Sequence, residues 1–208
     1  MHIADGALSG PVLIGGAVLA VAGTAVGLRK LDMETMPVTG VLSATFFVAS
    51  LVHIPVGATS VHLIMNGLAG LVLGWAAFPA LAVALLLQAV FFGFGGLTVL
   101  GVNTFNIAAP AVLMHYLCRQ GVVNANPRVA ALWGGISGAG AILATTVLVA
   151  LSLALSGDQF LPAARLTFLI HIPVMVIEAL VSAAAVFLVW RVRPELFDSL
   201  TQLKRGAA

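Results

Sequence analysis

The chain has 208 residues, of which 61% are hydrophobic and 8% are charged, and its formal net charge is +2. Roughly a quarter of the residues of a soluble domain are charged, and the mean hydropathy here is +1.14, so the composition indicates an integral membrane protein. The single Cys118 excludes an intrachain disulfide and any multi-cysteine metal site. Basic residues are scattered near segment ends and form no patch, so nucleic acid is not expected as a partner.

Apolar runs near the length of a bilayer-crossing helix recur along the chain. We expect an all-α fold, a polytopic membrane bundle of about seven transmembrane helices, in a single membrane domain that covers residues 1–208. The predicted spans cover residues 11–28, 37–53, 60–75, 78–94, 98–117, 129–155 and 166–190. The third and fourth predicted spans are separated by a very short link. If these two form one re-entrant pair, the number of spans is six.

The charges predict how the bundle lies in the membrane. With an odd number of spans, nearly all basic residues fall on one side, and only Arg165 lies on the other. The shared side holds Arg29, Lys30, Arg119, Arg128, Arg191, Arg193, Lys204 and Arg205. By the positive-inside rule that side is cytoplasmic. We therefore expect an outer-face segment at residues 1–10, the helix bundle at 11–190 and a cytoplasmic tail at 191–208.

The chain opens with "MHIADG", which carries an acid before the first span, whereas the basic residues follow that span. This order is the reverse of a secretory signal, so the first helix is expected to be retained. Because His2 is bulky, we also expect Met1 to stay in place with a free α-amine.

These first two residues can chelate a metal ion. The Met1 α-amine, the His2 backbone nitrogen and the His2 Nδ1 close a five-membered and then a six-membered ring around one ion. Displacing the amide proton in a tetragonal nitrogen site favours Ni(II) or Cu(II) over Zn(II) and Mg(II), with Co(II) a poorer fit. The alternative is that His2 is only a polar residue at the membrane interface.

A fourth ligand is expected from His62 in "GATSVHLIMNG". We predict that Thr59 or Ser60 caps a helix and that His62 lies in its first turn, where the positive helix end keeps the ring neutral. Asn66, four residues further on, would orient a ligand or the amino terminus from the same face. The remaining histidines, interpreted as structural or interfacial residues, are His53, His115 and His171.

"MHIADGALS", "GATSVHLIMNGLAGLVLG" and "LGVNTFNIAAPAV" together resemble the substrate-binding membrane component of the cobalt/nickel energy-coupling-factor transporters, over most of the chain. The resemblance implies a metal site made of Met1, His2 and His62, in a prokaryotic multi-pass protein of the inner (plasma) membrane. It also implies that the amino-terminal segment plugs the bundle. Asp5, Ser60, Asn66 and Asn103 are expected to support the ligands.

The resemblance also implies partners and a cargo. The partners are a transmembrane coupling subunit, ATP-binding-cassette ATPase subunits and a small additional membrane subunit, and ATP hydrolysis drives import of the ion. "MHIADG" resembles nickel-type members, whereas cobalt-type members carry Glu in place of Asp5, so Ni(II) is favoured over Co(II). The chain itself has no GxxxxGK[ST] motif, so it is not expected to be an enzyme or to hold a cofactor.

Two other functions remain as alternatives. In an ATP-independent metal channel or facilitator, the polar residues Asn103, Thr104 and Asn106 would line a path. In a rhomboid-like intramembrane serine protease, Ser137 of "GISG" would be the nucleophile and His171 its base, although both the spacing and the predicted topology oppose this. Glu178, deep in the last span, is left between a structural role and one at the coupling surface.

Overall fold

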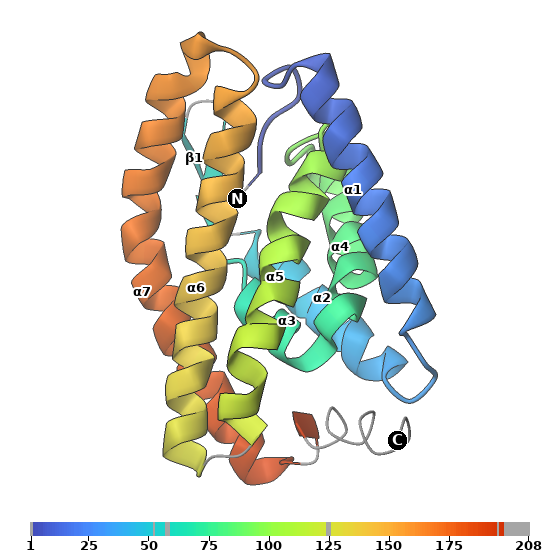
Figure 1. The fold of residues 1–208 in the computed structure, drawn as a ribbon, viewed down its shortest axis with the longest axis vertical. Helices are drawn as coiled ribbons and strands as arrows, with labels where there is room; N and C mark the ends of the chain where they lie inside the picture. Colours follow the sequence, from blue (N-terminus) through green and yellow to red (C-terminus); the bar gives the residue numbers. More distant parts are fainter. Residues whose placement is uncertain (1, 52, 57–58, 124–125, 195, 198–208) are drawn as a thin grey trace.

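The computed structural model describes residues 2–51, 53–56, 59–123, 126–194 and 196–197, with the backbone alone at 53–56 and 59–61. It is a helical bundle that carries one short β-hairpin (Figure 1). The helices are α1 (Gly10–Arg29), α2 (Met36–Ala49), α3 (Asn66–Leu73), α4 (Ala77–Phe92), α5 (Leu100–Val123), α6 (Pro127–Ala154) and α7 (Leu161–Val192). The strands are β1 (His53–Val56) and β2 (Thr59–His62), and the short 3₁₀ turns are η1 (Gly74–Ala76) and η2 (Asp158–Phe160).

The long helices run alternately up and down, so that the connections gather at two ends (Figure 1). At one end Ser9, which precedes α1, donates its N–H to the Ser156 hydroxyl between α6 and α7 at 3.1 Å. At the other end the Trp75 indole of η1 donates to the Tyr116 hydroxyl near the end of α5 at 2.9 Å. Arg165 follows η2 at the first end, and the other described basic residues lie at or beyond the opposite helix ends. By the positive-inside rule we expect that second end to face the cytoplasm.

Four stretches of the described chain are long and apolar enough to cross a membrane as helices. They are Gly10–Arg29, Asn66–Phe92, Pro127–Ala154 and Asp158–Val192, and α2 is a shorter apolar helix. The 27-residue stretch Asn66–Phe92 is not one straight helix, because Gly74 breaks it with a φ of 54° and the chain turns back through η1 (Figure 1). The third and fourth predicted spans therefore correspond to α3 and α4, two helices that are joined by the turn at η1.

The predicted third span, residues 60–75, is wrong over its first half. Residues 59–62 form β2, which pairs with β1 in antiparallel fashion, and α3 contains only 8 residues. Eight residues rise about 12 Å as an α-helix, less than half of a hydrocarbon core. Extended backbone within a membrane protein's bundle has to satisfy its polar groups inside the protein, and pairing between the two strands does part of that.

Helix α5 is the centre of the bundle and contacts α1, α3, α4 and α6. Its contact with α3 is close enough that a Cβ added at Gly70 would lie 2.0 Å from the Ala111 carbonyl oxygen. Small residues of this kind let membrane helices approach through their backbones. The result is a packed interior between α3, α4, α5 and the long α6–α7 pair, into which the amino terminus descends (Figure 1).

Candidate metal centre

The amino-terminal segment is inserted into the bundle and does not lie on its surface. His2 is 3% exposed and Ile3 is fully buried. The Asn103 Oδ1 on α5 accepts the Ile3 N–H at 2.9 Å, and its Nδ2 donates to the Ile3 carbonyl at 3.1 Å. This pair of hydrogen bonds satisfies the buried backbone of Ile3 and fixes the position of the adjacent His2.

The His2 ring is oriented by α4. Its Nε2 lies 2.7 Å from the Gln88 Oε1, and the Gln88 Nε2 donates to the Ser50 hydroxyl at the end of α2. Because the Gln88 amide uses its NH₂ on Ser50, its oxygen accepts from His2, and the proton of the neutral imidazole lies on Nε2. The Nδ1 of His2 then carries a lone pair, as the predicted six-membered chelate ring requires.

The Nδ1 of His2 faces His62. The distance from the His62 Nε2 to the His2 Nδ1 is 3.1 Å, although the two residues are 60 positions apart in the sequence. Their ring centroids are 4.6 Å apart. At the far side of the second ring, the His62 Nδ1 donates to the Leu63 carbonyl at 2.7 Å.

The hydrogen bonds assign the protons of both rings. A carbonyl oxygen only accepts, so the neutral His62 carries its proton on Nδ1 and its lone pair on Nε2. Two acceptor nitrogens therefore lie 3.1 Å apart, in rings whose planes meet at 28°, and a cation between them would stabilise this arrangement. Two nitrogens bound about 2.0 Å from one ion at 90° to 109° are about 2.8 to 3.3 Å apart, and the observed 3.1 Å lies in that range.

Burial lowers the pKa of His62 to about 4, although the hydrogen bond to the Leu63 carbonyl acts to raise this pKa. A ring that stays neutral is ready to bind a metal ion. The predicted reason for its neutrality was wrong, because His62 ends β2 and does not lie in the first turn of a helix. The expected helix cap at Thr59 or Ser60 is wrong for the same reason.

The other predicted supporting residues divide into two groups. Asp5 adjoins the inserted segment, where its N–H donates to the Gly95 carbonyl at 2.9 Å and its carboxylate accepts from the Thr98 hydroxyl. Asn66 instead binds α5 and α6, since its Nδ2 donates to the Ile107 carbonyl and the Thr145 hydroxyl. Only the backbone of Ser60 is described.

The predicted ligands at Met1 lie outside the described residues, whereas His2 and His62 lie within them. Among the residues that the structure describes, no group of three or more His, Cys, Asp or Glu side chains could hold a metal ion. A site at His2 and His62 would therefore need donors of another kind, and the α-amine and backbone amide of the predicted chelate are such donors.

One residue at this site was missed by sequence reasoning. Gln88 is fully buried in the otherwise apolar "ALLLQAVFF", and a lone amide in a membrane helix was a usable signal. Glu178 was expected either to bond inside the bundle or to lie at the coupling surface. Its Oε1 accepts the N–H of Ile64 and, at 2.8 Å, the N–H of Met65, so α7 holds the loop that follows His62.

Neither alternative function has a matching constellation in the described structure. The Ser137 hydroxyl donates to the Gly67 carbonyl at 3.0 Å, and His171 donates from Nδ1 to the Thr167 carbonyl at 2.6 Å, so each is engaged within the helix packing. His171 is buried inside α7, as its interpretation as a structural residue predicted. Among the polar residues of the supposed channel path, Asn106 donates to the Ser152 hydroxyl at 3.1 Å.

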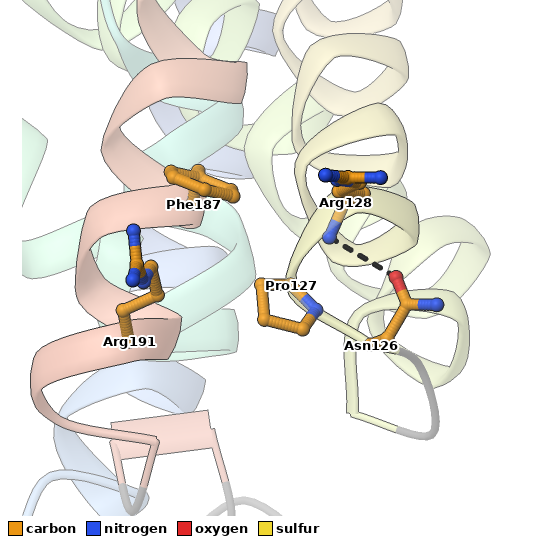
Figure 2. A pocket seen from close by; sticks show the side chains of 5 residues that line it. All are labelled: Asn126, Pro127, Arg128, Phe187 and Arg191. Carbon is orange, nitrogen blue, oxygen red and sulfur yellow. Dashed lines mark hydrogen bonds between the residues drawn. The ribbon is translucent and has the colours of Figure 1, made fainter.

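A cavity of about 440 Å³ lies at the opposite side of the bundle, between the start of α6 and the end of α7 (Figure 2). Asn126, Pro127, Arg128, Phe187 and Arg191 line it, and the Arg191 Cζ lies 5.5 Å from the centroid of the Phe187 ring. Two guanidinium groups repel a cation, so this cavity is no candidate for the metal centre.

Proteins that are similar to this chain in sequence or structure are named as metal transporters. A protein of Haemophilus influenzae named "Putative metal transport protein" is 44% identical over 205 residues, which cover 95% of this chain and 97% of that protein. The "Cobalt transport protein CbiM" of Sorangium cellulosum is 31% identical over the full length of both chains. A crystal structure of a truncated transition metal transporter matches with a TM-score of 0.72 and 26% identity, over 92% of this chain and 99% of that one.

A family model described as the cobalt uptake substrate-specific transmembrane region matches residues 2–196, nearly the whole described chain. Cobalt or nickel is the transported substrate of this family. The chain therefore belongs to the family of cobalt uptake substrate-specific transmembrane regions, as a multi-pass membrane component of metal transport and not an enzyme.

Proposed function

We propose that the chain captures Ni(II) at its outer face in a planar site of four nitrogens. The donors are the α-amine of Met1, the backbone nitrogen and Nδ1 of His2, and the Nε2 of His62. In such a plane the His2 Nδ1 and the His62 Nε2 are neighbours, and the ionised amide offsets part of the charge of the ion.

One observation carries this proposal: the His2 Nδ1 and His62 Nε2 are 3.1 Å apart while the other nitrogen of each ring faces an oxygen acceptor. A hydrogen bond between the two rings would need a proton on one of the facing nitrogens. The carbonyl of Leu63 keeps the His62 proton on Nδ1, and the Gln88 amide favours the His2 proton on Nε2. Both rings are thus prepared to bind the same ion.

Nickel is favoured over cobalt by the donor set. An ionised backbone amide and an amine form a strong, tetragonal field, which suits Ni(II) better than Co(II). Relatives named for each metal exist, such as the "Fused nickel transport protein NikMN" of Rhodobacter capsulatus, 40% identical over 114 residues that cover 52% of this chain and 33% of that protein. Asp5 in "MHIADG" resembles the nickel-type motif.

The proposal includes the energy source. This chain would act with a transmembrane coupling subunit, ATP-binding-cassette ATPases and a small additional membrane subunit, which together import the captured ion. A metal site assembled from an inserted amino terminus opens only when that segment moves, and a partner driven by ATP can supply that motion.

The test is titration of the metal-free chain in detergent with Ni(II) and, separately, with Co(II). We expect one ion per chain, tighter binding of Ni(II), and a loss of at least about 100-fold in affinity for His2→Ala and for His62→Ala. Cells that carry the whole transporter should lose uptake when the ATPase is disabled. Tight binding by His62→Ala would refute the proposed site. Uptake that persists without ATP hydrolysis would refute the proposed energy source.

A further inference from the structure

The loop that follows His62 is fixed by a carboxyl group from α7. Ile64 and Met65 both donate their N–H groups to the Oε1 of Glu178, the second at 2.8 Å. Glu178 is fully buried, so water does not compete for this oxygen. Met65 has a positive φ of 54°, a conformation that is costly for a residue with a side chain. One acceptor that takes two adjacent N–H groups stabilises the loop in this shape.

One peptide group connects this carboxyl group to the candidate metal ligand. The carbonyl of Leu63 and the N–H of Ile64 belong to a single planar unit, hereafter the relay peptide. Its carbonyl accepts the Nδ1–H of His62 at 2.7 Å, and its N–H donates to Glu178. Because the two groups of a trans peptide point in opposite directions, the imidazole and the carboxyl group lie on opposite sides of the relay peptide. The hydrogen bonds therefore run without interruption from Glu178 to His62.

Helix α6 holds both the end of the loop and the backbone of Glu178 in place. The Ser137 hydroxyl on α6 donates to the Gly67 carbonyl at the start of α3 at 3.0 Å. A Cβ added at Gly67 would lie 2.5 Å from the Ser137 carbonyl oxygen, so the two backbones are in contact there. At the next residue of α6, a Cβ added at Gly138 would lie 2.6 Å from the Glu178 carbonyl oxygen. One turn of α6 therefore sets the distance between the loop and α7.

We propose that Glu178 is a positioning residue of the metal site and acts on His62 through the relay peptide. By holding the N–H of this peptide, Glu178 keeps its carbonyl on the Nδ1 of His62, so that the lone pair of the ring stays on Nε2 and faces His2. The proposal rests on the proposed function, since the ion bound there is the cargo. An acceptor on the distal nitrogen of a ligating histidine fixes its tautomer and raises its basicity. A chain of hydrogen bonds polarises such an acceptor further.

A graded series of variants separates this role from a general contribution to packing. Glu178→Gln keeps an oxygen that can accept both N–H groups, Glu178→Asp draws the carboxyl group back by one methylene, and Glu178→Leu removes the acceptor. The matched control is Ser182→Ala. Ser182 lies one turn further along α7 and is fully buried, and its hydroxyl has no hydrogen-bond partner among the described residues. It therefore changes a buried polar group of the same helix without touching the relay peptide.

The first experiment measures the tautomer of His62 without any metal. The metal-free full-length chain, with isotope-labelled histidine rings, is studied by NMR at about pH 8, where histidine is neutral. The His62 signals are identified by their absence in His62→Gln. We expect the proton on Nδ1 in the unmodified chain, in Glu178→Gln and in Ser182→Ala. In Glu178→Leu, and to a smaller extent in Glu178→Asp, the form protonated on Nε2 should appear, with its proton facing the His2 Nδ1.

The second experiment measures the consequence for the ion by calorimetry with Ni(II). Glu178→Leu should bind about 10- to 100-fold more weakly than the unmodified chain, and Glu178→Gln within about threefold of it. Ser182→Ala should bind as the unmodified chain does.

Three results would refute the role given to Glu178. They are an Nε2 proton on His62 in the unmodified chain, an unchanged tautomer in Glu178→Leu, and equal losses of affinity in Glu178→Leu and Glu178→Gln. If the leucine variant does not fold, Glu178→Asp takes its place in both comparisons. Absence of Ni(II) binding in the unmodified chain would instead refute the proposed function, whereas the tautomer is measured without metal and is independent of that result.

Discussion

Asn103 holds the backbone of Ile3 from both directions, with its Oδ1 accepting the N–H at 2.9 Å and its Nδ2 donating to the carbonyl at 3.1 Å. Asparagine offers a donor and an acceptor side by side, as a neighbouring β-strand would. The buried amino-terminal segment thereby satisfies its polar backbone, and His2 is brought opposite His62.

Substitution of Asn103 by Ala should weaken metal binding. Two buried hydrogen bonds of about 1 kcal/mol each would be lost, which corresponds to a loss of about 10- to 100-fold in affinity. Calorimetry of the purified chain with Ni(II) measures this. Asn106→Ala is the control, since Asn106 is an equally buried amide on the same helix that bonds to Ser152 and not to the amino terminus. Equal losses in both variants would contradict the role given to Asn103.

Substitution of Gln88 by Leu should remove the acceptor that keeps the His2 proton on Nε2. Loss of such an acceptor costs about 10- to 100-fold in metal affinity, and the absorption band of bound Ni(II) should shift as the ring rotates. Gln88→Glu, which retains an oxygen at this place, should bind within about threefold of the unmodified chain. If the leucine variant matched the glutamate variant in both affinity and spectrum, Gln88 would not orient His2.

Substitution of Gly96 by Ala should displace the segment that carries Asp5. Gly96 has a φ of 128°, and an added Cβ would lie 2.0 Å from the Asp5 Oδ2. Gly93 is a matched control, because it also has a positive φ, 66°, but a Cβ there would meet no atom within 4 Å. Gly93→Ala should cost about 1 kcal/mol through backbone strain, and Gly96→Ala should lower the melting temperature further because the clash with Asp5 is added. Only Gly96→Ala should also lose metal affinity; an equal loss in Gly93→Ala would argue against the contact with Asp5.

The stability of the metal-free chain should fall in mild acid through His62. Burial lowers the pKa of this ring to about 4 in the folded chain, whereas an unfolded histidine titrates near 6.5. Between these two values the unfolded state binds more protons, so stability rises with pH and is lost as the pH falls from about 6.5 to about 4. Melting temperatures across this interval should drop less in His62→Gln than in the unmodified chain. Parallel curves would show that His62 is not buried in neutral form.

Much of the bundle could be predicted from the sequence, because a membrane helix is specified by apolar length and by flanking charge. Residues 11–28, 78–94, 98–117, 129–155 and 166–190 were predicted as spans, and α1, α4, α5, α6 and α7 occupy these regions. The failure came at residues 59–65. There the apolar residues are compatible with helix or strand, and the outcome depends on tertiary bonds such as those from Glu178 to Ile64 and Met65.

The ligands of the candidate site that follow from adjacency in the sequence could be predicted. The contacts that depend on how the helices pack were harder to predict. His2 follows directly after Met1, so a chelate could be written from the sequence alone, and His62 was chosen as the histidine that faces it. Asn103 was expected near the amino terminus, and it contacts Ile3. Asn66 was expected at the ligands because of a helical spacing from His62 that the strand removes, and Gln88 reaches His2 only through the return of α4.

The most direct test of the central claim is a single added residue. A chain that begins with one glycine before Met1 keeps His2 and His62 but moves the α-amine away from the chelate ring. Calorimetry with Ni(II) should show a loss of at least about 100-fold in affinity, whereas one glycine added at the carboxyl terminus should change nothing. Unaltered tight binding by the amino-terminally extended chain would contradict the four-nitrogen site.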